Sequence, residues 1–394
     1  MQSIRGENYF ETRKMNASQS VEKKAREGAH NLLVNCAAVV AGERVLILCE
    51  DARLGWYETD VAKLVAQVAT EMGAEVELRQ TEGPDNGFVD DSDSEASQAK
   101  KAKLMHGEFD CCIFFARIGD QLRFDREPTK VRRVMSYVSS LAELASDYGR
   151  IEYQAMSELK HAINTVLLNA GEVSISCSLG SDLRGQMSPA GGNVTQPDDV
   201  TVLRFPVGVH APIDASGFSG ELKLARYLTP TGSRVYEPAS IALDEVVGAR
   251  VEHGRVTAYE GKHTDVSSIR AHYDHVAQMF SLDADSLLSW HAGIHPGSQY
   301  FLDAAADPDR WSNKIFTNPR FVHFHTCGVE APGEICWMVL DPTICVDREP
   351  LWKVGELQLE YFAETKACIS RWPSLQRLFE APNVEIGLLD KSIG

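Results

Sequence analysis

The chain has 394 residues, and its 39 Lys and Arg set against 56 Asp and Glu give a formal net charge of −17. Hydrophobic residues make up 44% of the sequence and charged residues 24%, which excludes a wholly disordered chain and allows a sizeable core. A surface this negative repels phosphate backbones, so we expect no nucleic-acid partner. No apolar run reaches the roughly 18 residues that cross a bilayer, so we expect no membrane partner either.

The N-terminal residues and the cysteines indicate a cytoplasmic protein. The first twenty residues are polar and mixed in charge, without the apolar stretch of a signal peptide, and we expect a mobile leader over residues 1–21. The nine cysteines are odd in number and form no CxxC pair, and several lie in apolar runs such as VLILC and CCIFF. Reduced, buried thiols fit this pattern better than a disulfide framework does.

The first part of the chain alternates predicted strands and helices. Apolar runs such as RVLILC are typical of strands that are buried on both faces. This rhythm predicts an α/β domain over residues 22–170, in which helices cover both faces of a parallel sheet. We expect strands at 44–49, 74–80, 110–115 and 131–139, and helices at 22–40, 59–73, 95–106 and 153–169.

After residue 170 the sequence pattern changes. Short alternating segments separated by Gly, Pro and Asp are typical of antiparallel strands. We therefore place a domain boundary near residue 170 and predict a metal-binding α+β domain over 171–394 that is rich in antiparallel strands. Its expected strands lie at 172–179, 200–207, 220–228, 249–261, 287–295, 320–327 and 335–346, and its helices at 264–280 and 356–370.

Four of the twelve histidines lie in two short predicted strands, as His291 and His295 in SWHAGIHPG and as His323 and His325 in VHFHTCG. Side chains at positions i and i+2 share a face of a strand, so each pair points one way. Two such strands side by side would bring the imidazoles together, and imidazole is a good ligand for iron or zinc. Glu334, which leads directly into the next predicted strand, is the carboxylate that could complete a two-His-one-carboxylate set. The same HxH pattern also occurs in strands that bind no metal, and this alternative stays open.

The segment GSDLRG offers further polar side chains. It is either a loop that contacts a substrate or a simple hairpin turn. Asp182 in this segment and His295 are candidate general bases, on position alone. Arg184 is a candidate partner for an anionic oxygen or carboxylate of the substrate. The sequence has no GxSxG, HExxH or Walker motif, which argues against the enzyme classes that these motifs mark.

The order of several motifs resembles a known family. VVAGERVLILCED, EMGAEVEL, LGSDLRG, FPVGVHAPIDASGFSGELKL, RVEHGRVTAYEG, AGIHPGS and VHFHTCG follow one another from about residue 22 onward. Together they resemble the aminopeptidase T/aminopeptidase S family of metallopeptidases and its ring-cleaving branch, the 2,5-dihydroxypyridine 5,6-dioxygenases. The resemblance implies a metal-dependent enzyme that forms a homo-oligomer.

Two departures separate this chain from the peptidases that it resembles. Those peptidases carry metal-binding glutamates at two places where this chain has Val209 and Ser289. Two cations held close together without these carboxylates would repel each other. The resemblance therefore implies a single metal ion.

The dioxygenase branch holds one ferrous ion with a His at the second of those places and a later His-x-Asp pair. In this chain His291 lies two residues beyond that place. The later pair is His323-x-His325 or, in an alternative alignment, Glu334-x-Cys336. Both alignments therefore depart from the ligand pattern of the branch.

The leading hypothesis is a mononuclear non-haem Fe(II) dioxygenase that uses O₂ to open a hydroxylated aromatic or N-heteroaromatic ring, such as a dihydroxypyridine. The expected metal ligands are His291, His323, His325 and Glu334. The alternative is a metal-dependent aminopeptidase or other hydrolase that uses zinc or cobalt to activate water. A third hypothesis is a metal-free binding protein that kept the fold and lost the activity.

Overall fold

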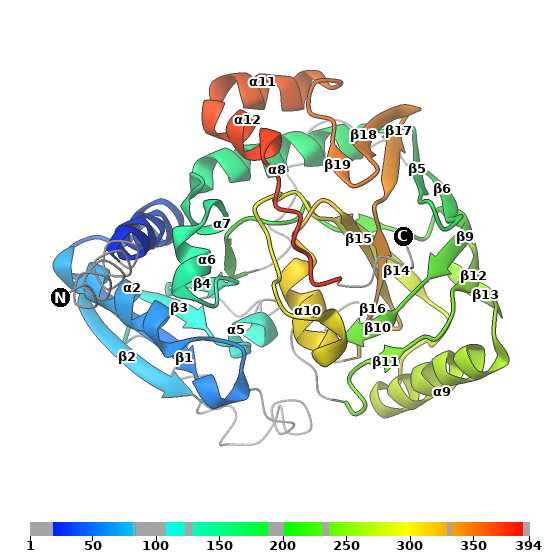
Figure 1. Cartoon of the computed structure of the whole chain (residues 1–394), viewed down its shortest axis with the longest axis horizontal. Coiled ribbons are helices and arrows are strands. Elements are labelled where there is room, and N and C mark those ends of the chain that lie inside the picture. Colours follow the sequence, from blue (N-terminus) through cyan, green and yellow to red (C-terminus); the bar gives the residue numbers. More distant parts are fainter. Residues whose placement is uncertain are drawn as a thin grey trace, which may run out of the picture.

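The structure is a computed structural model that describes residues 19–81, 83, 108–122, 129–187, 201–230, 236–328 and 333–388. It contains three sheets, of five, six and eight strands. In Figure 1 the blue and cyan strands of the five-stranded sheet lie on one side of the molecule, and the green to orange strands of the other two sheets lie on the other. The predicted fold class is confirmed: an N-terminal parallel α/β sheet is followed by a mixed part rich in antiparallel strands.

The five-stranded sheet is parallel throughout, with the order β2-β1-β3-β4-β7. Its central strands are apolar and buried along nearly their whole length, as expected for a sheet covered on both faces. The strands are β1 (Arg44–Glu50), β2 (Glu75–Thr81), β3 (Cys111–Phe115), β4 (Arg132–Ser136) and β7 (Leu203–Phe205). Around them lie η2 (Ala52–Leu54), α2 (Thr59–Glu71), α5 (Ile118–Gln121), α6 (Leu141–Ala145) and α7 (Asp147–Arg150).

The N-terminal helix differs from its prediction at both ends. It begins by residue 19, inside the expected leader, and changes at residue 31 into a π-helix, η1 (Asn31–Cys36). The Asn31 side chain donates to the backbone carbonyls of Gly149 (3.1 Å) and Ile151 (2.6 Å), which ties this helix to the end of α7. Residues 1–18 and the helix expected at 95–106 lie outside the described residues.

The strand order of the parallel sheet reverses between β1 and β3, and the carboxyl ends of these two strands carry a buried ion pair. Glu50 ends β1 and its side chain is fully buried, while Arg117 follows β3. The Glu50 carboxylate accepts hydrogen bonds from the Arg117 backbone N–H (3.0 Å) and from its Nη2 (2.8 Å). The guanidinium also lies over the Trp56 ring, 4.3 Å from the ring centroid. In open α/β sheets this reversal point is where ligands usually bind, and here protein side chains occupy it.

The two other sheets are antiparallel and pack face to face. Trp290, Phe324 and Trp337 from the six-stranded sheet share one buried core with Leu183 and Leu222 from the eight-stranded sheet. The six-stranded sheet has the order β11-β10-β16-β15-β14-β8, with β8 (Ile213–Asp214), β10 (Tyr227–Pro230), β11 (Ile241–Ala242), β14 (Leu287–Ala292), β15 (Phe321–Thr326) and β16 (Ile335–Leu340).

The eight-stranded sheet runs in the order β13-β12-β9-β6-β5-β17-β18-β19. Its strands are β5 (Glu172–Ser176), β6 (Asp182–Gln186), β9 (Phe218–Leu224), β12 (Val247–Glu252), β13 (Arg255–Glu260), β17 (Thr343–Val346), β18 (Glu349–Lys353) and β19 (Glu356–Leu357). The accompanying helices are α8 (Tyr153–Leu168), α9 (His263–Phe280), η4 (Ala304–Ala306), α10 (Pro308–Ile315), α11 (Ala363–Arg371) and α12 (Pro373–Glu380). No helix among the described residues is both long and apolar enough to span a membrane.

Helix α10 covers the second face of the six-stranded sheet and connects it to the parallel sheet. Trp311 and Ile315 of this helix form a small buried cluster with side chains of β15 and β16. On its other side, Lys314 Nζ donates to the backbone carbonyl of Tyr137, just after β4, at 2.7 Å. Figure 1 shows the yellow α10 between the two halves of the molecule.

Several strand and helix predictions were wrong in detail, and the segments predicted as single strands at 220–228 and 249–261 are each two strands. The segment 200–207 was expected to be antiparallel, but its strand β7 pairs in parallel with β4, with Leu203 beside Val134. The single strand expected at 335–346 is two strands in different sheets, separated by a turn in which Asp341 has φ +47°. The helix expected at 356–370 begins only at residue 363, after β19. The alternating pattern alone does not identify the partner of a strand, so the boundary near residue 170 stays a prediction.

Candidate metal centre

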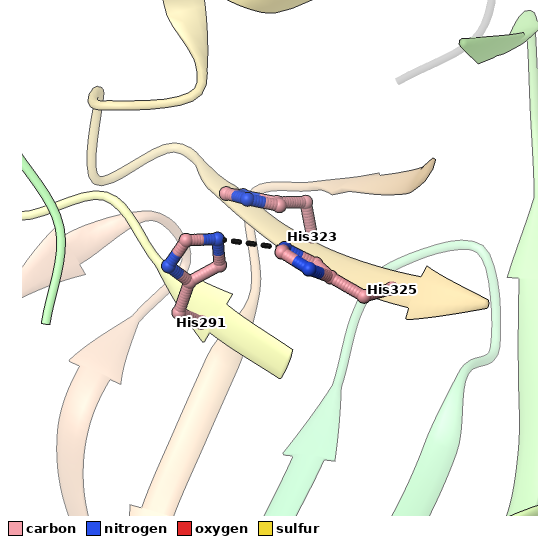
Figure 2. A group of neighbouring side chains, drawn as sticks. All are labelled: His291, His323 and His325. Atoms are coloured by element: carbon pink, nitrogen blue, oxygen red, sulfur yellow. Dashed lines mark hydrogen bonds between the residues drawn. The ribbon is translucent and has the colours of Figure 1, made fainter. Parts of the chain in front are cut away.

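The pairing of β14 with β15 brings three histidines together on one face of the six-stranded sheet. His291 lies directly opposite His323 in the antiparallel register, and Ser289 lies opposite His325. Opposite residues in an antiparallel pair share a face, and so do residues two apart on one strand. The three imidazoles therefore leave the sheet on the same side, as Figure 2 shows.

The three rings are close and buried. The Nε2 atoms of His291 and His325 are 2.9 Å apart. The ring centroids of His291 and His323 are 3.7 Å apart, and the rings of His323 and His325 stack with 18° between their planes. One nitrogen of each ring lies within 4.8 Å of the others, and each residue is at most 7% exposed.

This donor set fits one transition-metal ion. Two nitrogens bound to one ion at about 2.1 Å and about 90° would lie about 3.0 Å from each other, close to the spacing of the His291 and His325 Nε2 atoms. Burial, reinforced by His323 and His325, holds the pKa of His291 well below its usual range. A neutral imidazole offers a lone pair, which is the form that binds metal.

The surroundings of the three histidines are largely apolar. The Phe316 ring meets the His323 ring edge-on at 5.6 Å and the Tyr137 ring at 5.4 Å. On the neighbouring strand β16, Met338 lies opposite His323 and Cys336 lies opposite His325. These side chains keep bulk water from the imidazoles, which strengthens interactions with any charged ligand there.

Glu334 lies at the site, but on the outer side of His325. It directly precedes β16 and is 1% exposed. Its carboxylate oxygen contacts Nδ1 of His325, the ring nitrogen that does not face His291. The structure therefore brings all four predicted metal ligands together, with three nitrogens facing inward and the carboxylate behind one ring.

His295 does not share the strand of His291. Strand β14 ends at Ala292, and His295 follows in a turn, where its Nδ1 accepts from the Gly297 backbone N–H at 3.2 Å. Its ring is fully buried against Tyr148, with the ring centroids 4.8 Å apart. Burial lowers the pKa of His295 to about 3, so the neutral ring would be a weak base at neutral pH.

Asp182 and Arg184 lie elsewhere. Both are on β6 of the eight-stranded sheet, and both side chains are more than half exposed. Arg184 Nε donates to Asp182 Oδ1 at 3.1 Å, so the two groups satisfy each other at the surface. The segment is a strand and not a substrate loop, and the structure does not bring these residues to the histidines.

His210 is a buried residue near the centre that the sequence did not single out. Its ring centroid is 6.2 Å from that of His291. Its Nε2 accepts from the Ala292 backbone N–H at 2.9 Å, and its Nδ1 donates to the Ala211 carbonyl at 2.6 Å. His210 thus holds the end of β14 in place and has no nitrogen left for a metal. The only sequence signal was its place in the segment FPVGVHAP.

Comparisons with known proteins support the fold. No protein-family profile and no curated protein matches the sequence. Among solved structures, the chain is similar to 2,5-dihydroxypyridine dioxygenase from Pseudomonas putida KT2440, with 14% identity, a TM-score of 0.55, and coverage of 87% of this chain and 98% of that one. It is also similar to wild-type AmpT from Thermus thermophilus, with 11% identity, a TM-score of 0.46, and coverage of 86% and 99%. The first likeness shows a distant fold relationship, and a shared fold does not by itself fix function.

Proposed function

We propose that this chain is a metal-dependent enzyme in which His291, His323 and His325 hold one ferrous ion, and that it uses O₂ to open a hydroxylated aromatic or N-heteroaromatic ring. The observation that carries the proposal is the convergence of three buried imidazoles, with nitrogen atoms within 4.8 Å of one another. A dihydroxypyridine-like substrate is supported only by analogy with the 2,5-dihydroxypyridine dioxygenase of similar fold.

The side chains around the histidines favour one ion over two. Ser289 lies opposite His325, so a carboxylate at that position would reach the site, but serine supplies none. Val209 pairs with Gly293 just beyond β14 and is likewise without a ligand atom. A second cation would therefore meet the first with little negative charge to offset their repulsion.

His291, His323 and His325 would hold a ferrous ion, which would supply the electron exchange that lets O₂ react with an electron-rich ring. The protein's part is to orient the reactants and exclude water. Phe316 and Met338 beside the histidines are apolar side chains that suit contact with an aromatic ring. The charge of Arg204, which contributes to the low pKa of His291, would favour an anionic oxygen on the substrate.

The test is anaerobic reconstitution with Fe(II), followed by elemental analysis and oxygen uptake with dihydroxypyridines and catechols. One bound iron with substrate-dependent oxygen uptake supports the proposal. Two tightly bound zinc ions with peptidase activity would favour the hydrolase alternative, which shares the histidine cluster. If the protein binds no metal, the remaining hypothesis is a metal-free binding protein.

We also propose a cytoplasmic homo-oligomer whose partners are the aromatic substrate and O₂, with no nucleic acid or membrane. None of the nine cysteines, all of which lie in the described ranges, forms a disulfide. Reduced thiols suit the cytoplasm. Light scattering at micromolar concentration tests the assembly, and a monomer mass would contradict it.

A further inference from the structure

We propose that Glu334 is a positioning residue and not a metal ligand, and that the hydroxyl of Tyr236 fixes Glu334 in place. In this arrangement Glu334 sets the ring orientation of His325 from outside a three-histidine centre. The inference rests on the metal centre proposed above and specifies which atoms form it. It replaces the two-His-one-carboxylate set by three imidazole nitrogens with a buried carboxylate behind one of the rings.

The first observation is the direction of the two ring nitrogens of His325. Nε2 faces His291, 2.9 Å from its Nε2, whereas Nδ1 contacts the Glu334 carboxylate. The two lone-pair directions of an imidazole diverge, so one ion cannot lie on both nitrogens. An ion between Nε2 of His291 and Nε2 of His325 therefore has the His325 ring between itself and the carboxylate.

The second observation is that the backbone at the start of β16 is held by hydroxyl groups. Tyr236 is 2% exposed, and its hydroxyl donates to the Glu334 carbonyl at 2.9 Å. One residue later, Thr326 Oγ1 donates to the Ile335 carbonyl at 2.8 Å. Both carbonyls next to the carboxylate are thus anchored, which limits the positions that the Glu334 side chain can reach.

Helix α9 supports Tyr236 from behind. The Tyr236 ring packs edge-on against His272 at 5.6 Å and Phe280 at 6.4 Å. Tyr236 itself lies in the connection that follows β10. The position of Glu334 is therefore set by an element outside the two strands that carry the histidines.

This arrangement has a chemical consequence for His325. A carboxylate on Nδ1 retains the proton there, leaves the lone pair on Nε2 and makes that nitrogen a stronger donor. Such outer partners typically contribute about 10- to 100-fold to metal affinity. If the Glu334 carboxylate bound the ion directly, neutralising it by substitution would instead remove one of the metal ligands.

The experiment measures the Kd for Co(II), with a competing chelator, in the full-length protein and in Glu334→Gln, Tyr236→Phe and Tyr259→Phe. Tyr259→Phe is the matched control, because its buried hydroxyl has no hydrogen-bond partner among the described residues. We expect Glu334→Gln to weaken binding by about 10- to 100-fold, Tyr236→Phe to weaken it by less, and Tyr259→Phe to leave it unchanged. The unfolding midpoint of each metal-free protein serves as the folding control.

A crystal structure of the Co(II)-loaded protein completes the test. Three imidazole nitrogens on the ion, with Glu334 still on Nδ1 of His325, would support the inference. A Glu334 oxygen on the ion would overturn it, as would unchanged Kd values in both Glu334→Gln and Tyr236→Phe. A wild-type protein that binds no metal would instead refute the proposed function itself.

Discussion

The carboxyl edge of the parallel sheet and the histidine face of the six-stranded sheet are both buried and polar, but their polar groups are used differently. At the first, Glu50 and Arg117 satisfy each other through several hydrogen bonds, with Trp56 over the guanidinium. At the second, three imidazoles converge, and the Glu334 carboxylate contacts one of them from its outer side. A buried ion pair whose partners satisfy each other is typical of a structural role. Several imidazoles that converge on one point are instead typical of a metal-binding site.

This difference indicates which part of the chain carries the candidate functional site. The strand-order reversal between β1 and β3 is the usual ligand position in such a sheet. Protein side chains fill it here, and the candidate chemistry lies instead on antiparallel strands about 240 residues further along the chain. Four sets of substitutions would break or sharpen the comparison.

The largest expected effect is on the histidine face. Replacing His323 or His325 with Ala should abolish iron binding and turnover while the fold remains, because a three-ligand site that loses one imidazole loses several kcal/mol of binding free energy. Iron content, oxygen uptake and circular dichroism measure the three properties. Variants with full iron and full rate would show that the metal, if any, binds elsewhere.

The next effect concerns the paired edge. Arg117→Met leaves the Glu50 carboxylate buried without its partner, and we expect a loss of about 3 kcal/mol in the free energy of unfolding. Metal affinity should not change. Urea unfolding measures the loss, and adding Glu50→Gln should restore part of it, since the unpaired charge is then gone. An Arg117→Met protein that lost its metal but kept its stability would contradict the structural role that we assign to the Glu50–Arg117 pair.

A smaller effect is expected from Phe324→Leu, between the two histidines of β15. Phe324 is fully buried and points into the core between the antiparallel sheets, away from the imidazoles. The substitution should cost about 1 kcal/mol of stability and leave iron content unchanged. The thermal midpoint and elemental analysis check this, and a loss of iron would indicate that the alternation along the strand is disturbed.

The smallest effect is expected from Asp182→Ala and Arg184→Ala. These side chains pair with each other at the surface of β6, so their placement predicts unchanged turnover and an unchanged melting midpoint. The sequence suggested a base and an anion-binding residue at these positions. A clear fall in kcat for either variant would support that earlier expectation.

The sequence predicted the parts of the fold that depend on local periodicity. The buried runs of β1 and β3 predicted central parallel strands, and the 3–4 spacing of apolar residues predicted α9. The HxH pattern of β15 correctly indicated that His323 and His325 share a face. The sequence around His291 and His295 did not indicate that strand β14 ends at Ala292, so that His295 lies outside the strand and does not share the face of His291.

What the sequence missed depends on contacts between distant segments. Which side of His325 meets Glu334 is decided by how the chain enters β16, and no spacing encodes this. The role of His210 depends on its hydrogen bond to Ala292, 82 positions away. Local patterns fix the faces of single elements, whereas pairing between elements is a property of the whole fold.

Strand β7 has a consequence for how the protein can be divided and how it folds. The chain leaves the parallel sheet after α8, forms β5 and β6 in the eight-stranded sheet, and returns to place Leu203–Phe205 against β4. A fragment cut near residue 170 would expose the hydrogen-bonding edge of β4, and unpaired edges invite aggregation. The last strand of the parallel sheet therefore cannot pair until the ends of a long chain segment have come together, which slows folding.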